Sequence, residues 1–370
     1  MSHLFSPFDL GPVKLKNRIV VAPMCQYSSE DGLANDWHLI HLGQLALSGA
    51  GLLILEATAV EPEGRITAED LGLWSDANEA ALSQVIRSIQ KHSTMPLGIQ
   101  LSHAGRKASS RAPWEGGQLV PIADGGWLPS GPSAIEHAAG EPPPRAMVAS
   151  DLTRIAQAFA TAAQRAQRVG IRVIELHMAH GYLLHQFLSP ISNQREDAYG
   201  GSLENRLRFP LEVFDAVRAA VPSEIAVGVR ISGTDWVEGG WEIDQSVTLG
   251  KALAQRGCAF MHVSSGGISP KQQIPLGPNY QVHLAEQVRK ETGLPTMAVG
   301  LITEAQQAED IVAQGRADMV ALARGILYNP HWPWHAAAAL GAQVDAPRQY
   351  WRSQPRGLSG LFGDVTIGQR

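Results

Sequence analysis

The chain alternates short apolar runs with longer amphipathic stretches. Several of the apolar runs are continuously hydrophobic, which is typical of strands that are covered on both faces. The stretch 150–170 has the clearest helical pattern, because its apolar side chains recur every three or four residues and Gly170 follows as a stop signal. We therefore predict eight strands, each followed by a helix. The predicted strands cover residues 18–24, 51–60, 97–103, 172–180, 225–232, 260–266, 295–300 and 319–325.

Eight strands in strict alternation with helices favour a single (β/α)8 barrel over an open, doubly wound sheet. The chain has 370 residues, which exceeds the ~250 residues typical of this fold. The surplus lies in residues 104–149, a long loop rich in Pro, Gly and Trp after the third strand, and in an irregular tail after residue 342. We expect residues 1–370 to form one α/β barrel domain whose active site lies at the carboxyl ends of the strands.

Composition argues against several classes of protein. The formal net charge of −5 argues against a nucleic-acid surface, which needs clustered Lys and Arg. Two cysteines, Cys25 and Cys258, cannot build a disulfide framework, a four-thiolate zinc site or an iron–sulfur cluster. No apolar run approaches the ~18 to 20 residues of a membrane helix, and the first residues lack the pattern of a secretion signal. We therefore expect a soluble protein of the cytoplasm.

Polar side chains follow the predicted strands and would meet at one mouth of the barrel. His177, His180 and Tyr182 follow the fourth strand. Arg230 lies inside the apolar fifth strand, and a buried arginine must be paired or must face an anion. We therefore favour a functional role for Arg230. The other candidates at strand ends are Cys25, Tyr27, Gln100, His103, Ser265, Gly300 and Arg324.

The ends of the seventh and eighth strands predict a phosphate site, because this fold usually binds phosphate there. Backbone amides at Gly300 and Gly325, together with the Arg324 guanidinium, can hold a phosphate monoester. Simpler roles stay open for some candidates. Arg324 would then form a surface salt bridge, Cys25 would be a small buried side chain, and Tyr27 would serve packing.

The pair His177 and His180 allows two interpretations. In the first, the imidazoles are ligands of a zinc ion in a barrel hydrolase or lyase. In the second, both rings donate N–H groups to one substrate oxygen, and Tyr182 delivers a proton. No GxGxxG stretch occurs in the sequence, so any redox cofactor must be held in the barrel mouth. The nearest candidates for a third zinc ligand are His103, Glu56 and Glu175.

Five segments of the chain carry specific motifs, APMCQYS (22–28), QLSHAGRKA (100–108), HMAHGYLLHQFLSPISNQREDAYGGSLENRLRF (177–209), VSSGG (263–267) and AVGLITEAQQAEDIVAQGRADMVALARGILYNP (298–330). Together they resemble the old yellow enzyme family. The central segment is long and specific, and the resemblance extends from Phe5 to about Arg356. Histidine at both positions of the pair, and cysteine at position 25, match the thermophilic-like branch of FMN-dependent ene-reductases.

The resemblance implies that FMN is bound noncovalently at the strand carboxyl ends, with NADPH as the electron donor. The backbone from Pro23 to Cys25 would lie along the isoalloxazine ring, and Arg230 would face its N1 and C2 carbonyl region. Gln100 would bond the pyrimidine edge. The implied FMN-binding residues are Pro23, Met24, Cys25, Ala57, Gln100, Arg230, Ser265, Gly300, Ala323 and Arg324.

The same resemblance favours the second interpretation of the histidine pair. An α,β-unsaturated carbonyl or nitro compound would accept hydrogen bonds from His177 and His180, and Tyr182 would protonate its α-carbon. Tyr27 would contact the substrate, and Cys25 would modulate the flavin potential. Hydride would pass from NADPH through flavin N5 to the β-carbon, in ping-pong kinetics.

The tail is similar to the C-terminal segment of that branch, which reaches into a neighbouring subunit's site. Trp351 and Arg352 are the implied substrate contacts, so residues 343–370 would serve a partner in a homodimer or homotetramer. Relatives that carry an iron–sulfur cluster are a poor match, because two cysteines cannot supply four thiolates. A flavin-binding protein without turnover stays open as an alternative.

Overall fold

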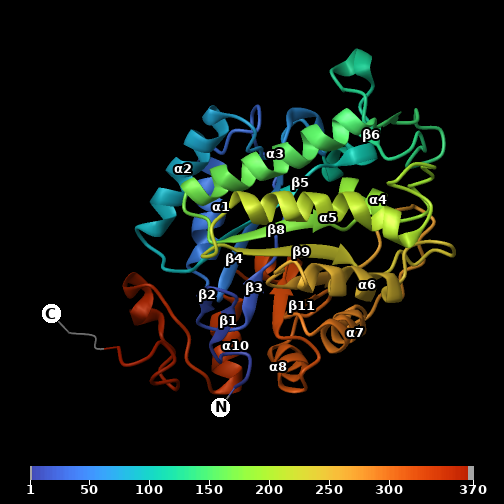
Figure 1. The fold of residues 1–370 in the computed structure, drawn as a ribbon. Coiled ribbons are helices and arrows are strands. Elements are labelled where there is room, and N and C mark those ends of the chain that lie inside the picture. The colour runs from blue at the N-terminus through green and yellow to red at the C-terminus, as the bar shows by residue number, and fades with distance from the viewer. Residues whose placement is uncertain (1, 366–370) are drawn as a thin grey trace.

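The computed structural model describes residues 2–365 and contains a closed barrel of eight strands (Figure 1). Every neighbouring pair in the barrel is parallel, so the predicted (β/α)8 architecture is confirmed. Around the barrel the strands follow chain order and close between the last and the first. They are β3 (Ile19–Val21), β4 (Leu52–Ala59), β5 (Leu97–Ser102), β8 (Val173–Met178), β9 (Ala226–Ser232), β10 (Met261–Ser264), β11 (Thr296–Val299) and β12 (Met319–Leu322).

Each barrel strand is followed by at least one helix, as predicted. The helix expected at 150–170 spans Ala149–Arg168 and buries Leu152, Ile155 and Phe159, which lie on one face at helical spacing. The helices are α1 (Asp36–Ala46), α2 (Asp76–Gln90), α3 (Ala149–Arg168), α4 (Leu183–Leu188), α5 (Leu203–Ala220), α6 (Ile243–Ala254), α7 (Val282–Thr292), α8 (Ala305–Ala313), α9 (Arg324–Tyr328) and α10 (Trp332–Leu340). Within the described residues, no helix is long and apolar enough to cross a membrane.

The amino-terminal end of the barrel is filled with apolar side chains. A short antiparallel hairpin, β1 (Phe8–Leu10) and β2 (Val13–Leu15), contributes to this filling. Because apolar side chains fill the end at which the strands begin, the polar side chains inside the barrel lie nearer the carboxyl ends of the strands. The inner apolar cluster consists of Leu10, Val13, Leu15, Val20, Ala22, Leu52, Ile54, Val173, Ala226, Phe260, Met297, Val299, Met319 and Ala321.

The long loop predicted after the third strand is present between β5 and α3. It holds three short 3-10 helices, η2 (Gly105–Lys107), η3 (Pro113–Glu115) and η4 (Ile122–Asp124), and a small pair of strands, β6 (Ser130–Gly131) and β7 (Arg145–Ala146). A further 3-10 helix, η1 (Pro62–Gly64), follows β4. Side chains of the long loop return to the barrel mouth, where Arg106 donates to the carbonyl of Ile268.

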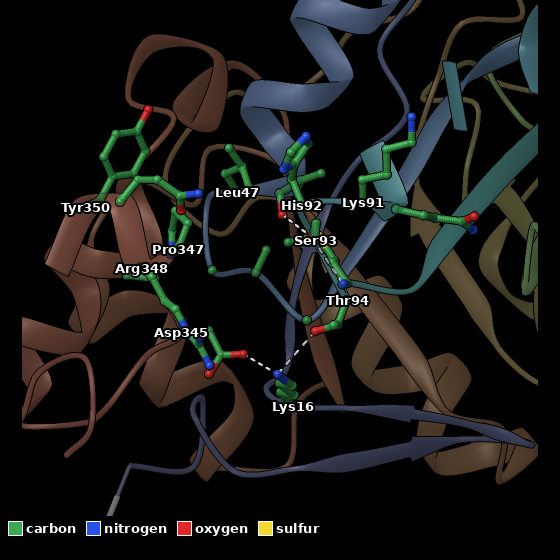
Figure 2. Close-up of a pocket in the computed structure, with 18 of the residues that line it drawn as sticks. Lys16, Leu47, Lys91, His92, Ser93, Thr94, Asp345, Pro347, Arg348 and Tyr350 are labelled. Atoms are coloured by element: carbon green, nitrogen blue, oxygen red, sulfur yellow. Dashed lines mark hydrogen bonds and ion pairs between the residues drawn. The ribbon is translucent and has the colours of Figure 1, made fainter. Parts of the chain in front are cut away.

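The tail packs at the opposite end of the barrel from the mouth. Its 3-10 helix η5 (Arg348–Ser353) borders a cavity of about 850 Å³, which is also lined by Gly51 and Pro96, the residues directly before β4 and β5. Figure 2 shows this cavity, with Lys16 paired to Asp345 of the tail. In Figure 1 the tail lies at the left, and α4, which follows the carboxyl end of β8, lies at the right. Of the predicted domain 1–370 and tail 343–370, residues 1 and 366–370 lie outside the described residues.

Candidate active site

The carboxyl ends of the barrel strands bring nearly all predicted site residues to one mouth. The placement of the site residues on β8 follows from the alternation of side chains between the two faces of a strand. Val173 belongs to the inner apolar cluster, so Glu175 and His177 also face the barrel interior. In chain order the mouth receives Pro23, Met24, Cys25 and Tyr27 after β3, Ala57 from β4, Gln100 from β5, His177, His180 and Tyr182 from β8 and its loop, Arg230 from β9, Ser265 after β10, Gly300 after β11, and Ala323 and Arg324 after β12.

His177, His180 and Tyr182 form one aromatic cluster. The ring centroids of the two histidines are 5.1 Å apart, and those of His177 and Tyr182 are 4.9 Å apart. The turn that follows the strand has positive φ at His180 and Gly181, which ends the strand at Met178 rather than at residue 180. This reversal folds the second histidine and the tyrosine back toward the first. The predicted grouping of three proton-bearing side chains is therefore present.

Both histidines are neutral at neutral pH. Burial, with Arg230 nearby, holds the pKa of His177 and of His180 well below the ordinary value. The backbone N–H of Ala179 donates to His177 Nδ1 at 3.3 Å, so the proton of the neutral ring sits on Nε2. His180 Nε2 lies 2.8 Å from the Ser264 hydroxyl. Each ring is thus fixed through one nitrogen and has the other for a ligand.

Tyr182 keeps its proton at neutral pH. Burial raises the pKa of this phenol far above its ordinary value, and the Cys25 and Asp70 side chains raise it further. The ammonium of Lys107 lies 5.0 Å from the ring centroid and donates to the carbonyl of His180 at 2.9 Å. Burial lowers the pKa of Lys107 to about 8. The tyrosine is therefore a neutral acid held beside a partly buried cation.

Cys25 and Tyr27 line the same space as Tyr182. Their side chains pack together against one apolar cluster of Ile66, Ala104 and Ala108. Burial raises the pKa of Cys25 well above that of a free thiol, so this side chain is a neutral thiol rather than a reactive thiolate. It is hydrogen bonded to the Tyr27 side chain and near the backbone of Ala57.

Arg230 has a buried side-chain donor that a polar ligand would satisfy. It is only 7% exposed, and its Nε is buried without a hydrogen-bond partner among the described residues. The carboxylate of Glu175 is the nearest strong opposing charge, although burial lowers the pKa of the guanidinium overall. An unpaired donor on a buried cation is costly unless a ligand accepts from it. The carbonyl and N1 edge of a flavin would satisfy this donor, so the residues fit the implied cofactor.

The predicted phosphate end of the site contains Gly300 and Arg324. Gly300 has φ +112°, and a Cβ at this position would lie 2.4 Å from the amide of Gln281, so the position requires glycine. Arg324 is exposed at the start of α9 and makes no ion pair with any described residue, which argues against the surface salt bridge. Tyr280 interacts electrostatically with both Arg324 and Arg230 and so links the two ends.

The zinc interpretation is not supported, because every proposed third ligand has partners elsewhere in the structure. Glu56 accepts the backbone N–H of Gln26, and His103 lies 2.9 Å from Glu61. Glu175 accepts from two other side chains of the barrel interior. Across residues 2–365, no three histidine, cysteine or acidic side chains meet in a group that can hold a metal ion.

Trp351 and Arg352 are not at this mouth in their own chain. Trp351 lines the cavity at the amino-terminal end of the barrel, packs against the tail cluster with Trp334, and donates through its indole N–H to the carbonyl of Ala346. Their predicted substrate role therefore requires a second subunit.

Several residues support this cluster through contacts that the sequence does not show. Asp235 lies 2.8 Å from His185, whose Nδ1 accepts the N–H of Gly181 at 2.9 Å, and this fixes the turn that carries the second histidine. Ser264 and Lys107 hold His180 from two other elements. Ser264 and Lys107 lie inside the motif segments 263–267 and 100–108, but their contacts with His180 join segments far apart in the chain.

The buried histidines predict how stability depends on pH. Unfolded imidazoles protonate near pH 6.5, whereas burial holds the pKa of His177 and His180 well below that value and that of His103 at about 4. Below ~6.5 the unfolded chain binds more protons, so the free energy of unfolding falls as the pH drops. Asp70 acts in the opposite sense, because burial raises its pKa to about 7, but the histidines whose pKa is lowered outnumber it. Thermal unfolding from about pH 7 to about pH 5 should show a falling Tm, and a constant or rising Tm would contradict this.

Comparison with known proteins identifies similar chains over nearly the full length. A family model described as the NADH:flavin oxidoreductase / NADH oxidase family matches residues 3–343. The chain is 44% identical over 351 residues to a protein named NADPH dehydrogenase from Geobacillus thermodenitrificans, covering 94% of this chain and 98% of the relative. An NADPH dehydrogenase from Listeria innocua is 41% identical over 355 residues, with 95% and 99% covered.

A solved structure shares the fold as well. Morphinone reductase in complex with tetrahydroNAD superposes with a TM-score of 0.76 at 30% identity, covering 94% of this chain and 93% of that chain. The similarity therefore spans the whole barrel.

Proposed function

The chain belongs to the NADH:flavin oxidoreductase / NADH oxidase family, and we propose that, as an FMN-dependent oxidoreductase supplied by NADPH, it reduces the activated C=C bond of α,β-unsaturated carbonyl or nitro compounds. Family membership confirms the resemblance to the old yellow enzymes. The observation that carries the substrate class is the cluster of His177, His180 and Tyr182. Two neutral N–H donors beside a neutral acid suit an electron-poor alkene with one oxygen acceptor.

The residues that would hold FMN lie on the barrel strands or in the segments directly after them. Arg230 and Gln100 would hold the pyrimidine side, and the backbone of residues 23–25 would lie along the ring. Gly300, Ala323 and Arg324 would hold the phosphate, with Ser265 nearby. When bound, FMN accepts a hydride from NADPH and donates one to the substrate. No dinucleotide domain is needed, because donor and substrate take turns at one site in a ping-pong sequence.

The side chains around the substrate perform three tasks. His177 and His180 donate hydrogen bonds to the substrate oxygen and stabilise the negative charge that develops there. Tyr182 donates its phenolic proton to the α-carbon. Tyr27 contacts the substrate, and the neutral thiol of Cys25 hydrogen bonded to it adjusts the flavin environment.

The visible absorption spectrum of the purified protein tests this function. NADPH is added anaerobically, followed by 2-cyclohexenone. A flavin spectrum that bleaches with NADPH and returns with the enone would support the proposal. A yellow protein that bleaches but does not recover with the enone would indicate another acceptor. A preparation that stays colourless after addition of FMN would reject the function.

His177→Ala should weaken the binding of phenols, whose phenolate oxygen resembles the developing enolate. Loss of one hydrogen bond to a charged oxygen costs about 1.5–3 kcal/mol, which corresponds to roughly 10- to 100-fold in Kd. The charge-transfer absorption of the phenol complex measures the affinity. His283→Ala, at a histidine outside the cluster, is the matched control. Unchanged phenol affinity in the His177 variant would exclude the oxygen-binding role.

We also propose a homodimer or homotetramer in which residues 343–370 complete a partner's site, with Trp351 and Arg352 as substrate contacts. The position of these residues at the far end of their own barrel supports this arrangement. A cytoplasmic location agrees with the two unpaired cysteines. Mixing an Arg352→Ala chain with a His177→Ala chain tests the arrangement. Sites completed in trans would regain part of the lost activity, and no recovery would argue against it.

A further inference from the structure

Inside the barrel, the side chains change from apolar to polar directly next to the inner apolar cluster, on the side of the mouth. On β8, Val173 belongs to that cluster, and Glu175 is the next residue on the same face. Gln100 on β5 is the register partner of Glu175, and His262 on β10 is the register partner of Arg230 on β9. Glu175 and His262 are fully buried, and Gln100 is 2% exposed. A carboxylate in this position is costly unless its neighbours compensate it.

Glu175 has two hydrogen-bond partners that account for both of its oxygens. Oε1 accepts from the Gln100 side-chain amide at 2.7 Å, and Oε2 accepts from His262 Nδ1 at 2.8 Å. Arg230 adds an electrostatic attraction, because the carboxylate raises the pKa of the guanidinium against the effect of burial. The buried charge is therefore stabilised by two donors and one cation.

An ionised carboxylate can only accept, and this fixes the orientation of the Gln100 amide. The amide must turn its NH2 group toward Glu175, so its carbonyl Oε1 faces away from the carboxylate. No described residue donates to that Oε1. The same argument places the proton of His262 on Nδ1, and burial together with Arg230 lowers the pKa of this imidazole, so the ring is neutral.

We propose that Glu175 is a positioning residue for the flavin site. It directs the Gln100 carbonyl toward the mouth, where it accepts from the N3–H of the flavin pyrimidine, and it places one negative charge beneath the Arg230 guanidinium. The inference rests on the proposed function, because it takes the cofactor to be FMN held by Gln100 and Arg230. His262 supports the carboxylate from the side opposite Gln100.

The charge of Glu175 has a consequence for reduction. A two-electron reduced flavin carries negative charge near N1, which Arg230 stabilises and a nearby carboxylate opposes. Glu175 therefore holds the reduction potential of bound FMN lower than Arg230 alone would set it. A lower potential favours transfer of the hydride from the flavin to the substrate alkene.

Glu175→Gln tests the charge and the orienting role of the carboxylate together, and Glu175→Asp tests the orienting role alone. Glu175→Gln keeps the size of the side chain and removes the charge, so the midpoint potential of bound FMN should shift to a more positive value. Glu175→Asp keeps the charge and shortens the reach to Gln100, so FMN should bind about tenfold more weakly while the potential stays near that of the wild type. Midpoint potentials are measured by dye equilibration, and FMN affinity by fluorescence quenching on titration of the apoprotein. Glu291→Gln, an exposed carboxylate on α7, controls for net charge.

The role through Gln100 has its own test. In a Gln100→Leu background, Glu175→Asp should no longer change FMN affinity, because the amide that it orients is absent. Potentials and affinities that match the wild type in both Glu175 variants would overturn the inference while leaving the proposed function intact. A wild-type protein that binds no FMN would overturn both. If Glu175→Gln does not fold, the Asp variant and its Gln100→Leu partner still decide the orientation role.

Discussion

Tyr182→Phe should slow reoxidation of the reduced enzyme by an enone by about 10²- to 10⁴-fold, the range typical of removing a positioned general acid. Reduction by NADPH should stay within about twofold of the wild-type rate, because hydride transfer to the flavin requires no proton from this phenol. The two half-reactions are measured separately by anaerobic stopped-flow absorbance. The substitution removes one oxygen from a partly buried ring and keeps its packing against His177.

The structure gives the reason for this asymmetry. The raised pKa of Tyr182 keeps the proton on the phenol until a strong carbon base develops beside it. Lys107, whose ammonium lies over the ring face, stabilises the phenolate that is left after proton transfer. Lys107→Met should therefore slow the same half-reaction, by less than the tyrosine variant.

A second tyrosine variant serves as the control for the acid role of Tyr182. Tyr199→Phe removes a phenol from the loop before α5, where the hydroxyl contacts Glu212 outside the mouth, and it should leave both half-reactions unchanged. Equal losses in the two half-reactions of Tyr182→Phe would mean that the phenol serves the structure of the site rather than proton delivery.

The barrel could be predicted from the sequence because its strands are buried on both faces. Continuous apolar runs such as 51–60 and 225–232 have no other common explanation when helices separate them. The hairpin β1–β2 could not be predicted in this way, since each of its strands has three residues and its apolar face is defined only by the barrel end that it covers. The extent of the fourth strand was overestimated, because the positive φ of His180 depends on tertiary contacts.

The residues that lie at the candidate site could be predicted from the sequence, but the contacts among them could not. Strand ends identify Gln100, His177 and Arg230, because polar residues that end apolar strands must meet at one mouth. Glu175 and His262 lie 87 positions apart in the chain, and their contact depends on register and on the alternation of faces. The sequence shows only that a glutamate lies within an apolar strand. The neighbouring strands of the structure show which side chains stabilise its charge.

Arg230 and Glu175 are best understood as one unit. Each charge is buried in the barrel interior, and removing either one leaves the other without its nearest opposing charge. A single substitution therefore changes both the folding stability and the flavin site, and only paired substitutions separate the two effects.

Arg230→Met should yield a protein that retains little FMN and whose remaining flavin is reduced by NADPH at least about 10²-fold more slowly, the range for loss of one preorganised donor to a developing anion. It should also unfold at a lower temperature, because Glu175 loses its cation. Arg230→Lys keeps the charge but not the planar set of donors. Its flavin content and reduction rate should therefore lie between those of the wild type and those of Arg230→Met. Flavin content and reduction rate are measured by absorbance, and Tm by the thermal unfolding of the apoprotein.

The double variant Arg230→Met with Glu175→Gln distinguishes the two roles of the arginine. Removing the carboxylate together with the guanidinium relieves the uncompensated charge, so Tm should recover most of the loss. Flavin reduction should stay slow, because no donor faces the N1 edge. Reduction that recovers along with Tm would show that Arg230 acts only by balancing Glu175, and normal reduction in the single variant would exclude its role at the flavin altogether.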